Sequence, residues 1–340
     1  MRENEPRNNR KDPRTLRVVL VTNLYPVANS PERGVFVRRQ VEALNRLLSH
    51  PIQIVIVGRT GAGGLQESRN AVWRACDESP PDLLHVYYGL SGSAVPLRLR
   101  IPMVVSLCGS DVLSWHVGKR PRGFVEYLVS VATVARARGV IAQSGCIRTA
   151  LPIERLRRKV TLLPSGIDRT RFRPLDPRAC RERLGWPRDA PIVLFPADAR
   201  RPEKQYSLAR AAVSLVPWKG SELVLRDMAG VPPDDVPLYL NAADCVLITS
   251  AWEAGPIVLS EAMACGTPVV SVPVGYARDL GDRAPSLRVV PPIPALLARA
   301  VEESVMRRPA FLPVEESPFP TDDEYADRLL ALYANAAAEG

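Results

Sequence analysis

Residues 250–271 read SAWEAGPIVLSEAMACGTPVVS and carry the most informative pattern in the chain. Seven residues separate Glu253 from Glu261, and a glycine and a proline, Gly255 and Pro256, lie between them. Proline fits the first turn of a helix, because the amide that it lacks has no partner there in any case. We therefore expect a helix to begin at this proline, with free amides that bind an anion such as a diphosphate. Carboxylates in this setting suit hydrogen bonds from sugar hydroxyls, because an unpaired buried charge is costly.

A Glu-x7-Glu spacing is common by chance, and the simpler interpretation makes Glu261 an ordinary solvated helix residue. The continuation Gly266–Ser271 adds a helix stop and a short β-branched strand. The whole string resembles the Glu-x7-Glu signature of the retaining, nucleotide-sugar-dependent glycosyltransferases of family 4, and it looks like their teichuronic-acid type of polysaccharide enzyme. This resemblance implies the GT-B fold, an α/β architecture in which two Rossmann-like domains with parallel sheets face each other across a cleft.

The rest of the chain alternates short β-branched runs with helical segments such as Phe36–Leu48 and Phe124–Ala137, as α/β proteins do. We predict strands at Leu16–Val21, Ile52–Val57, Leu83–Tyr87, Met103–Leu107, Val140–Gln143, Val160–Leu163, Ile192–Phe195, Glu222–Leu225, Cys245–Thr249, Pro268–Val272 and Leu287–Val290. Gly61–Gly64 fails the dinucleotide-binding fingerprint, because Gln66 stands at the position of its third glycine. We interpret this glycine-rich segment as a flexible loop.

The length of 340 residues favours two domains, at roughly 150 residues for each. Residues 16–168 are predicted to form the N-terminal, acceptor-side domain, and residues 169–315 the C-terminal, nucleotide-sugar-binding domain. Residues 1–15 are predicted to be a disordered basic lead-in, and the segment Leu163–Asp189, rich in Pro, Arg and Asp, to be the interdomain linker. An amphipathic helix is predicted within residues 321–340, and the GT-B resemblance implies that it crosses back to the N-terminal domain.

Cysteine, histidine and acidic patterns predict neither a disulfide framework nor a metal site. The six cysteines are scattered without a Cys-x-x-Cys pair, only three histidines occur, and no Asp-x-Asp is present. We expect no cofactor apart from a nucleoside diphosphate sugar as substrate. Met1–Arg17 is polar throughout, and runs such as Ile52–Val57 are too short to span a bilayer, so a cytoplasmic protein is expected.

The formal net charge of +9 raises three explanations: nucleic acid, an anionic membrane surface, or an anionic substrate. Basic clusters lie at Lys119–Arg122, Arg155–Lys159 and Arg169–Arg173. Aromatic residues are only 6% of the chain and no nucleic-acid motif accompanies the clusters, so we expect no nucleic-acid partner. Docking on the inner face of a membrane or binding of anionic ligands fits better, and a solvated basic face is the alternative.

Arg201 and Lys204 follow the predicted strand that ends at Phe195, in the place where open α/β sheets bind ligands. Two cations there suit a diphosphate leaving group, whose negative charge grows in the transition state. Arg200 is the alternative to Arg201 in this register, and a solvated capping loop is the alternative to both. Near the first strand, Gly34 opens a helix after a long loop, where backbone amides can approach a phosphate.

The family resemblance assigns roles to these donor-side residues. It implies that Glu261 binds the ribose hydroxyls and Glu253 the hydroxyls of the donor sugar. It also implies that Arg201 and Lys204 stabilise the departing diphosphate. Other residues implied at the donor site are Gly34, Gly255, Pro256, Ile257 and Val258.

Two further segments resemble the acceptor-side loops of the family, and they contain His85, Cys108 and Asp111. Cys108 stands where the family has a histidine, which leaves that histidine's role near the transferred sugar in doubt, because a thiol is a weak hydrogen-bond donor. Asp111 as a helix cap and His85 as a structural histidine are the alternative interpretations.

Together these features predict a metal-independent, retaining glycosyltransferase that moves a hexose-type sugar to an acceptor hydroxyl. The acceptor is expected to be a glycan or a lipid-linked saccharide of the cell envelope or of an exopolysaccharide. Two alternatives remain open at this stage: a nucleotide-sugar epimerase on the same two-domain plan, and a non-catalytic nucleotide-sugar-binding protein.

Overall fold

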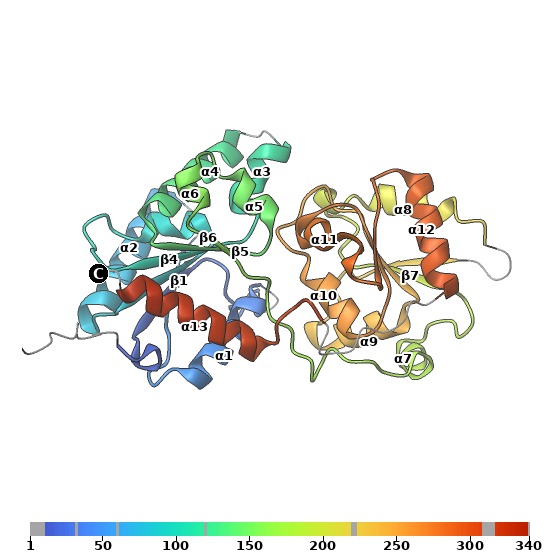
Figure 1. Ribbon diagram of the computed structural model, residues 1–340, viewed down its shortest axis with the longest axis horizontal. Helices are drawn as coiled ribbons and strands as arrows, with labels where there is room; N and C mark the ends of the chain where they lie inside the picture. Colours follow the sequence, from blue (N-terminus) through green and yellow to red (C-terminus); the bar gives the residue numbers. More distant parts are fainter. Residues whose placement is uncertain are drawn as a thin grey trace, which may run out of the picture.

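The structure is a computed structural model that describes residues 11–30, 33–58, 61–118, 121–218, 223–307 and 317–338. These residues form two lobes, each built around a parallel sheet (Figure 1). Most of the predicted lead-in, residues 1–10, lies outside the described part of the chain, as do Lys119 and Arg120 of one basic cluster.

The first lobe holds a six-stranded parallel sheet in the order β2-β1-β3-β4-β5-β6. Its strands are β1 (Val18–Thr22), β2 (Gln53–Ile56), β3 (Leu83–Tyr87), β4 (Met103–Leu107), β5 (Gly139–Ala142) and β6 (Val160–Leu162). Its helices are α1 (Val35–Leu47), α2 (Gly61–Glu78), α3 (Ser110–Gly118), α4 (Pro121–Arg136), α5 (Gly145–Ala150) and α6 (Glu154–Arg157), with short 3-10 helices η1 (Pro13–Thr15) and η2 (Gly89–Ala94).

The second lobe holds a five-stranded parallel sheet in the order β11-β10-β9-β7-β8. Its strands are β7 (Ile192–Phe195), β8 (Val224–Asp227), β9 (Cys245–Ile248), β10 (Val269–Ser271) and β11 (Leu287–Val289). Its helices are α7 (Pro177–Leu184), α8 (Tyr206–Ser214), α9 (Val236–Ala242), α10 (Ile257–Ala264), α11 (Gly275–Leu280) and α12 (Pro294–Arg307), with 3-10 helices η3 (Pro202–Lys204), η4 (Pro233–Asp235) and η5 (Gly281–Arg283).

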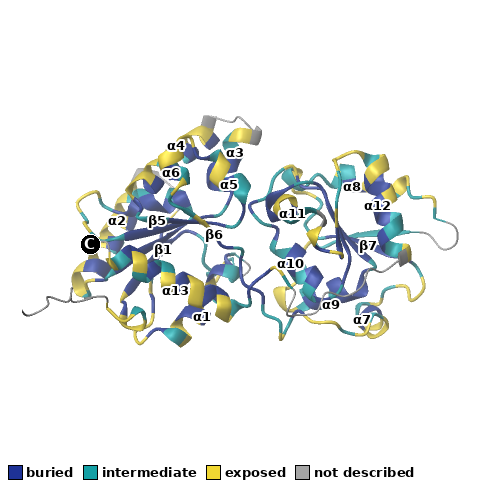
Figure 2. Cartoon of the chain, viewed as in Figure 1, coloured by how far each residue is buried: buried dark blue, intermediate teal, exposed yellow. Residues whose placement is uncertain are grey.

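Helices cover both faces of each sheet, which explains why the strands are apolar runs rather than alternating patterns. In the first lobe, alternate residues of β1 enter different cores: Val19 and Val21 pack with α2 and α4, whereas Val18 and Leu20 pack with α1. Figure 2 shows the strands in the colour of burial and the outer sides of the helices exposed. The predicted α/β class with two parallel sheets is confirmed.

The last helix, α13 (Asp322–Ala338), leaves the second lobe and lies against α1 of the first lobe (Figure 1). Its buried residues Tyr325, Leu329 and Tyr333 belong to the same core as α1 and β1. The Tyr333 hydroxyl is 2.6 Å from Nδ1 of the buried His85, on β3. The end of the chain is therefore an integral part of the first lobe.

Three segments differ in detail from the sequence predictions. Gly61–Gly64 is the first turn of α2 rather than a loop, because the helix is held by packing of residues such as Val72 on the sheet. The predicted linker does connect β6 to β7, and it also contains α7, which begins after the capping residue Asp176. In the predicted disordered lead-in, residues 13–15 form η1, and Lys11 is 2.5 Å from the Asp82 carboxylate.

Within the described residues, none of the helices combines the length and the apolar character that crossing a bilayer requires.

The two lobes touch at the turn before α10, where the Ser144 hydroxyl donates to the Ala254 carbonyl. Close by, the Gly145 amide donates to the Asp279 carboxylate at 2.8 Å.

Candidate active site

A cavity of about 350 Å³ lies between the lobes, at the carboxyl ends of β7 and β9. Parallel α/β sheets bind ligands at this edge, where the loops diverge. The first lobe contributes Phe36, from α1, and the second lobe contributes the rest of the lining. The structure brings these predicted residues together here: Arg201, Lys204, Glu253, Gly255, Pro256, Ile257 and Val258.

Lys204 and Glu253 form an ion pair in this cavity, and their side chains are only 18% and 14% exposed. The Lys204 ammonium and the Ser250 hydroxyl both donate to the same carboxylate oxygen, Oε1, the hydroxyl at 2.7 Å. Among the described residues, no donor reaches the other oxygen, Oε2, of Glu253. The carboxylate is therefore held in place by one oxygen while the second can accept a hydrogen bond from a ligand hydroxyl.

Two hydrogen bonds join the loop around η3, which carries Lys204, to the segment that carries Glu253. The Thr249 hydroxyl donates to the Lys204 carbonyl at 3.0 Å, and the Ala251 amide donates to the Glu203 carbonyl at 2.8 Å. These bonds fasten the cation loop to the segment that carries Glu253. As a result, the ammonium and the carboxylate share one rigid frame.

Arg201, rather than Arg200, lines the cavity. Its side chain is 56% exposed and lies 2.6 Å from Glu203. Arg200 points away and makes a bidentate contact with Asp198, which holds the pKa of that carboxyl at about 2. The choice between the two arginines, open in the sequence, is settled in favour of Arg201 as the residue that lines the cavity.

The turn before α10 places free amides at the cavity wall. Pro256 precedes the helix without a side-chain cap, and the Tyr276 hydroxyl donates to its carbonyl at 2.5 Å. A Cβ on Gly255 would lie 2.3 Å from the Tyr276 ring, so only glycine fits there. The amides of Ile257 and Val258 have no partner inside the helix and face a site that suits a phosphate.

Glu261, one helical turn further along α10, does not line this cavity. Its carboxylate lies 3.7 Å from the Arg39 guanidinium of α1, and Arg39 also contacts Asp322 at 2.9 Å. Burial raises the pKa of Glu261 to about 7, against an opposing effect of Arg39 and Arg171. No local pattern in the sequence indicates Arg39, because its contact with Glu261 depends on how the two lobes face each other.

Gly34 also lies outside the cavity lining. It has a φ of +68° and precedes α1, where a Cβ would approach the Leu24 carbonyl to 2.5 Å. Glycine is therefore needed for the close packing of two backbone segments at this point. Gly34 places Phe36 of the same helix at the wall of the cavity.

A second cavity of about 630 Å³ lies on the first lobe, and Phe36 lines it as well as the first one. Cys108, predicted on the acceptor side, lines this second cavity. Asn23, directly after β1, contributes a buried side-chain oxygen that has no hydrogen-bond partner among the described residues. A buried acceptor without a donor is costly unless a ligand satisfies it. Its place after a strand was the signal that sequence reasoning left unused.

His85 and Asp111, predicted on the acceptor side, line neither cavity and are held by contacts inside the first lobe. His85 is buried between the Ser106 hydroxyl, at 2.8 Å, and Tyr333, and it lines neither cavity. Burial lowers its pKa to about 3, so the ring is neutral. Asp111 is fully buried and accepts hydrogen bonds from the amides of Gly89 and Gly109.

Residues 228–304, which include α10 and its preceding turn, match the model of the family described as Glycosyl transferases group 1. This part of the chain is therefore similar to the group 1 glycosyltransferases. Its curated relatives include D-inositol 3-phosphate glycosyltransferase 2 of Catenulispora acidiphila, 28% identical over 237 residues, which are 57% of this chain and 55% of the relative. The putative teichuronic acid biosynthesis glycosyltransferase TuaC of Bacillus subtilis is 27% identical over 246 residues, 65% of this chain and 60% of the relative.

Solved structures with a similar fold cover nearly all of this chain. Sucrose-phosphate synthase from Thermosynechococcus elongatus has a TM-score of 0.70 at 18% identity and covers 95% of this chain and 96% of its own. Anabaena HepE in complex with UDP-glucose has a TM-score of 0.65 at 16% identity and covers 95% of this chain and 98% of its own. These likenesses show that the fold is GT-B. The chain matches little more than half of the length of the curated relatives, 55% and 60%.

Proposed function

We propose that this chain transfers a sugar from a nucleoside diphosphate sugar to an acceptor hydroxyl, with retention of configuration and without a metal ion. The observation that carries the proposal is the cavity in which Lys204, Arg201 and the first amides of α10 surround Glu253. Cations and helix-start amides suit a diphosphate. A carboxylate with one unused oxygen suits the hydroxyls of the attached sugar.

In this proposal the diphosphate lies between Lys204, Arg201 and the amides of Ile257 and Val258. The bond between the anomeric carbon and the diphosphate oxygen breaks, and the acceptor oxygen bonds to the same face of that carbon. The acceptor proton goes to the leaving phosphate oxygen, so no side chain acts as general base. Cations fixed before the reaction stabilise the developing charge better than mobile water does.

The ribose of the donor is proposed to bind beside Glu261, deeper along α10. The acceptor is proposed to enter through the second cavity, where the Asn23 side-chain oxygen accepts a hydrogen bond from one of its hydroxyls. Because Phe36 lines both cavities, donor and acceptor meet at that residue. The name of the relative TuaC, a putative teichuronic acid biosynthesis glycosyltransferase, supports an envelope glycan as the acceptor.

The test is a donor screen with UDP-, GDP- and ADP-sugars that measures nucleotide binding and release of nucleoside diphosphate. Arg201→Ala is expected to lower turnover by about 100-fold, the usual effect of removing one group that stabilises developing charge. Arg200→Ala is the matched control, because Arg200 pairs with Asp198 outside the cavity. Absence of binding and of turnover with every donor would refute the proposal, and formation of a free sugar isomer without acceptor would indicate an epimerase.

A further inference from the structure

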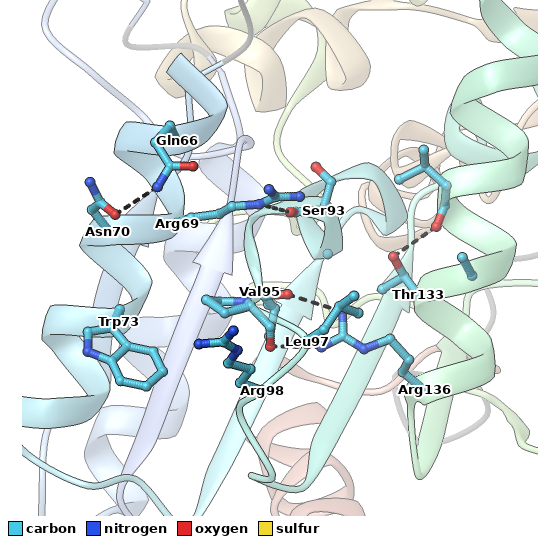
Figure 3. A pocket seen from close by; sticks show the side chains of 14 residues that line it. Gln66, Arg69, Asn70, Trp73, Ser93, Val95, Leu97, Arg98, Thr133 and Arg136 are labelled. Atoms are coloured by element: carbon cyan, nitrogen blue, oxygen red, sulfur yellow. Dashed lines mark hydrogen bonds between the residues drawn. The ribbon is translucent and has the colours of Figure 1, made fainter. Parts of the chain in front are cut away.

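A groove of about 710 Å³ lies on the first lobe, away from the donor cavity (Figure 3). Its walls are α2, α4 and the segment that runs from η2 to Arg98. Three arginines from these three walls, Arg69, Arg98 and Arg136, extend into the same space. The donor site described above uses none of these residues.

The three guanidinium groups carry charge that no carboxylate offsets within the described residues. Arg69 donates to the Ser93 carbonyl at 3.1 Å, and Arg136 donates to the carbonyls of Val95 and Pro96 at 3.1 and 3.2 Å. No Asp or Glu lines the groove. Backbone carbonyls thus hold two of the cations in fixed positions, and their donors not used in these bonds remain available for an anion.

Exposed apolar side chains also line the groove, and exposing them to water is unfavourable. Trp73 is 46% exposed and Leu97 is 82% exposed, and both side chains face the arginines in Figure 3. A large exposed aromatic ring beside cations is typical of a surface that binds something. Its flat apolar face suits the apolar face of a sugar ring or a hydrocarbon chain.

This groove continues the second cavity of the site. Ser93 lines both, and each runs between the same two helices. Along α2 and α4 the second cavity extends as far as Ser68 and Glu126, and the groove extends further, to Trp73 and Arg136. A molecule that extends from the second cavity along these helices therefore enters the groove.

We propose that the groove is a distal acceptor subsite, which holds a phosphate or carboxylate group of an extended acceptor whose reacting hydroxyl lies in the second cavity. This inference rests on the proposed transferase function and names the acceptor as anionic and longer than one sugar. Two sources share the chemistry: a uronic-acid-containing glycan and the diphosphate of a polyisoprenyl-linked saccharide. The inward direction of the arginines and the helical walls favour a chain in a groove over a flat bilayer.

The experiment measures binding to the full chain by titration calorimetry with defined probes. Oligogalacturonate supplies carboxylates, farnesyl diphosphate supplies a diphosphate on an isoprenoid, and a maltooligosaccharide of the same length as the uronate is the neutral comparison. Arg69→Gln with Arg98→Gln removes two cations and keeps polar side chains. Arg210→Gln, on α8 of the other lobe, is the control for the loss of an exposed positive charge, and it is compared with Arg69→Gln alone as well as with the double variant.

At least one anionic probe is expected to bind more tightly than the neutral sugar, and the double variant is expected to weaken it by about tenfold or more. The Arg210 variant should bind like the wild type. Trp73→Ala should weaken the same probe without altering nucleotide binding at the donor cavity. The better of the two anionic probes identifies the source of the anion.

Equal affinities of the double variant and the wild type for both anionic probes would overturn the inference. So would binding to phosphatidylglycerol vesicles alone, because that result would make the groove part of a membrane-docking face. Donor turnover is read separately. If nucleotide sugars neither bind nor react, the proposed function fails. If they bind and react but the double variant binds the anionic probes as tightly as the wild type, only the distal subsite is refuted.

Discussion

Arg39 of α1 and Glu261 of α10 face each other across the lobes, with 3.7 Å between guanidinium and carboxylate. The same guanidinium contacts Asp322, the first residue of α13, through both of its carboxylate oxygens. One arginine of the first lobe therefore joins the helix proposed to bind ribose to the segment that returns from the second lobe. A ligand that engages Glu261 must share this carboxylate with Arg39.

The first prediction concerns the protonation of Glu261 and the stability of the ligand-free protein. Its pKa rises from 4.5 to about 7 on folding, so the folded state binds more protons between these values. This contribution is complete below pH 4.5 and is lost as pH rises through 7, by up to about 3 kcal/mol. Urea unfolding across that range should show a decline in the wild type relative to Glu261→Gln. Parallel pH profiles of the two proteins would contradict it.

The second prediction separates sugar binding from nucleotide binding at Glu253. Glu253→Gln removes the charge that faces the ligand and leaves Lys204 without its carboxylate partner. Affinity for the nucleotide sugar should fall by roughly 10- to 100-fold, the usual range for a lost hydrogen bond to a charged group. Affinity for the nucleoside diphosphate should stay the same or rise, because the freed ammonium binds phosphate. Titration calorimetry with both ligands measures this, and equal losses for both would contradict the role of Glu253.

The sequence predicts the strands well because buried parallel strands are continuous apolar runs. Leu83–Tyr87 and Met103–Leu107 begin and end in the structure at the predicted residues. The Gly61–Gly64 segment fails because glycine disfavours helices locally, yet packing of the rest of α2 on the sheet decides the outcome. At α7 the local signals were present: Asp176 caps the helix and Gly185 ends it in the left-handed conformation.

In the candidate cavity, Glu253 and Val258 lie in one turn and the helix that follows it, and Lys204 follows the neighbouring strand β7, as the sequence predicts. The sequence does not show whether Arg200 or Arg201 lines the cavity, because that depends on which of the two forms the ion pair with Asp198. It also does not indicate the contact between His85 and Tyr333, which are 248 residues apart. Contacts between distant segments leave no trace in local spacing.

The third prediction tests the contact between the lobes at Gly109, which has a φ of +100°. A Cβ there would approach the Ala254 Cβ to 2.6 Å, next to Glu253. Gly109→Ala should therefore push the turn that carries Glu253 away from the first lobe and lower donor turnover. The control is Gly185→Ala, which has a comparable φ of +64° and nothing within 4 Å.

Both alanine variants should lose about 1 kcal/mol of stability from backbone strain, measured by urea unfolding. Only Gly109→Ala should also reduce turnover and increase the radius of gyration in X-ray scattering. If the two variants keep equal turnover, closure at this contact does not matter for the reaction.

The fourth prediction concerns the anchor of α13 on the first lobe. Tyr333→Phe leaves His85 Nδ1 buried without its partner, which should lower the free energy of unfolding by about 1–3 kcal/mol. Tyr239→Phe is the control, because no hydrogen bond of the Tyr239 hydroxyl occurs among the described residues. Nucleotide binding should be unchanged in both variants, since His85 lies outside both cavities. Urea unfolding at neutral pH measures the difference, and a Tyr333→Phe protein as stable as the control would show that this contact does not hold the helix.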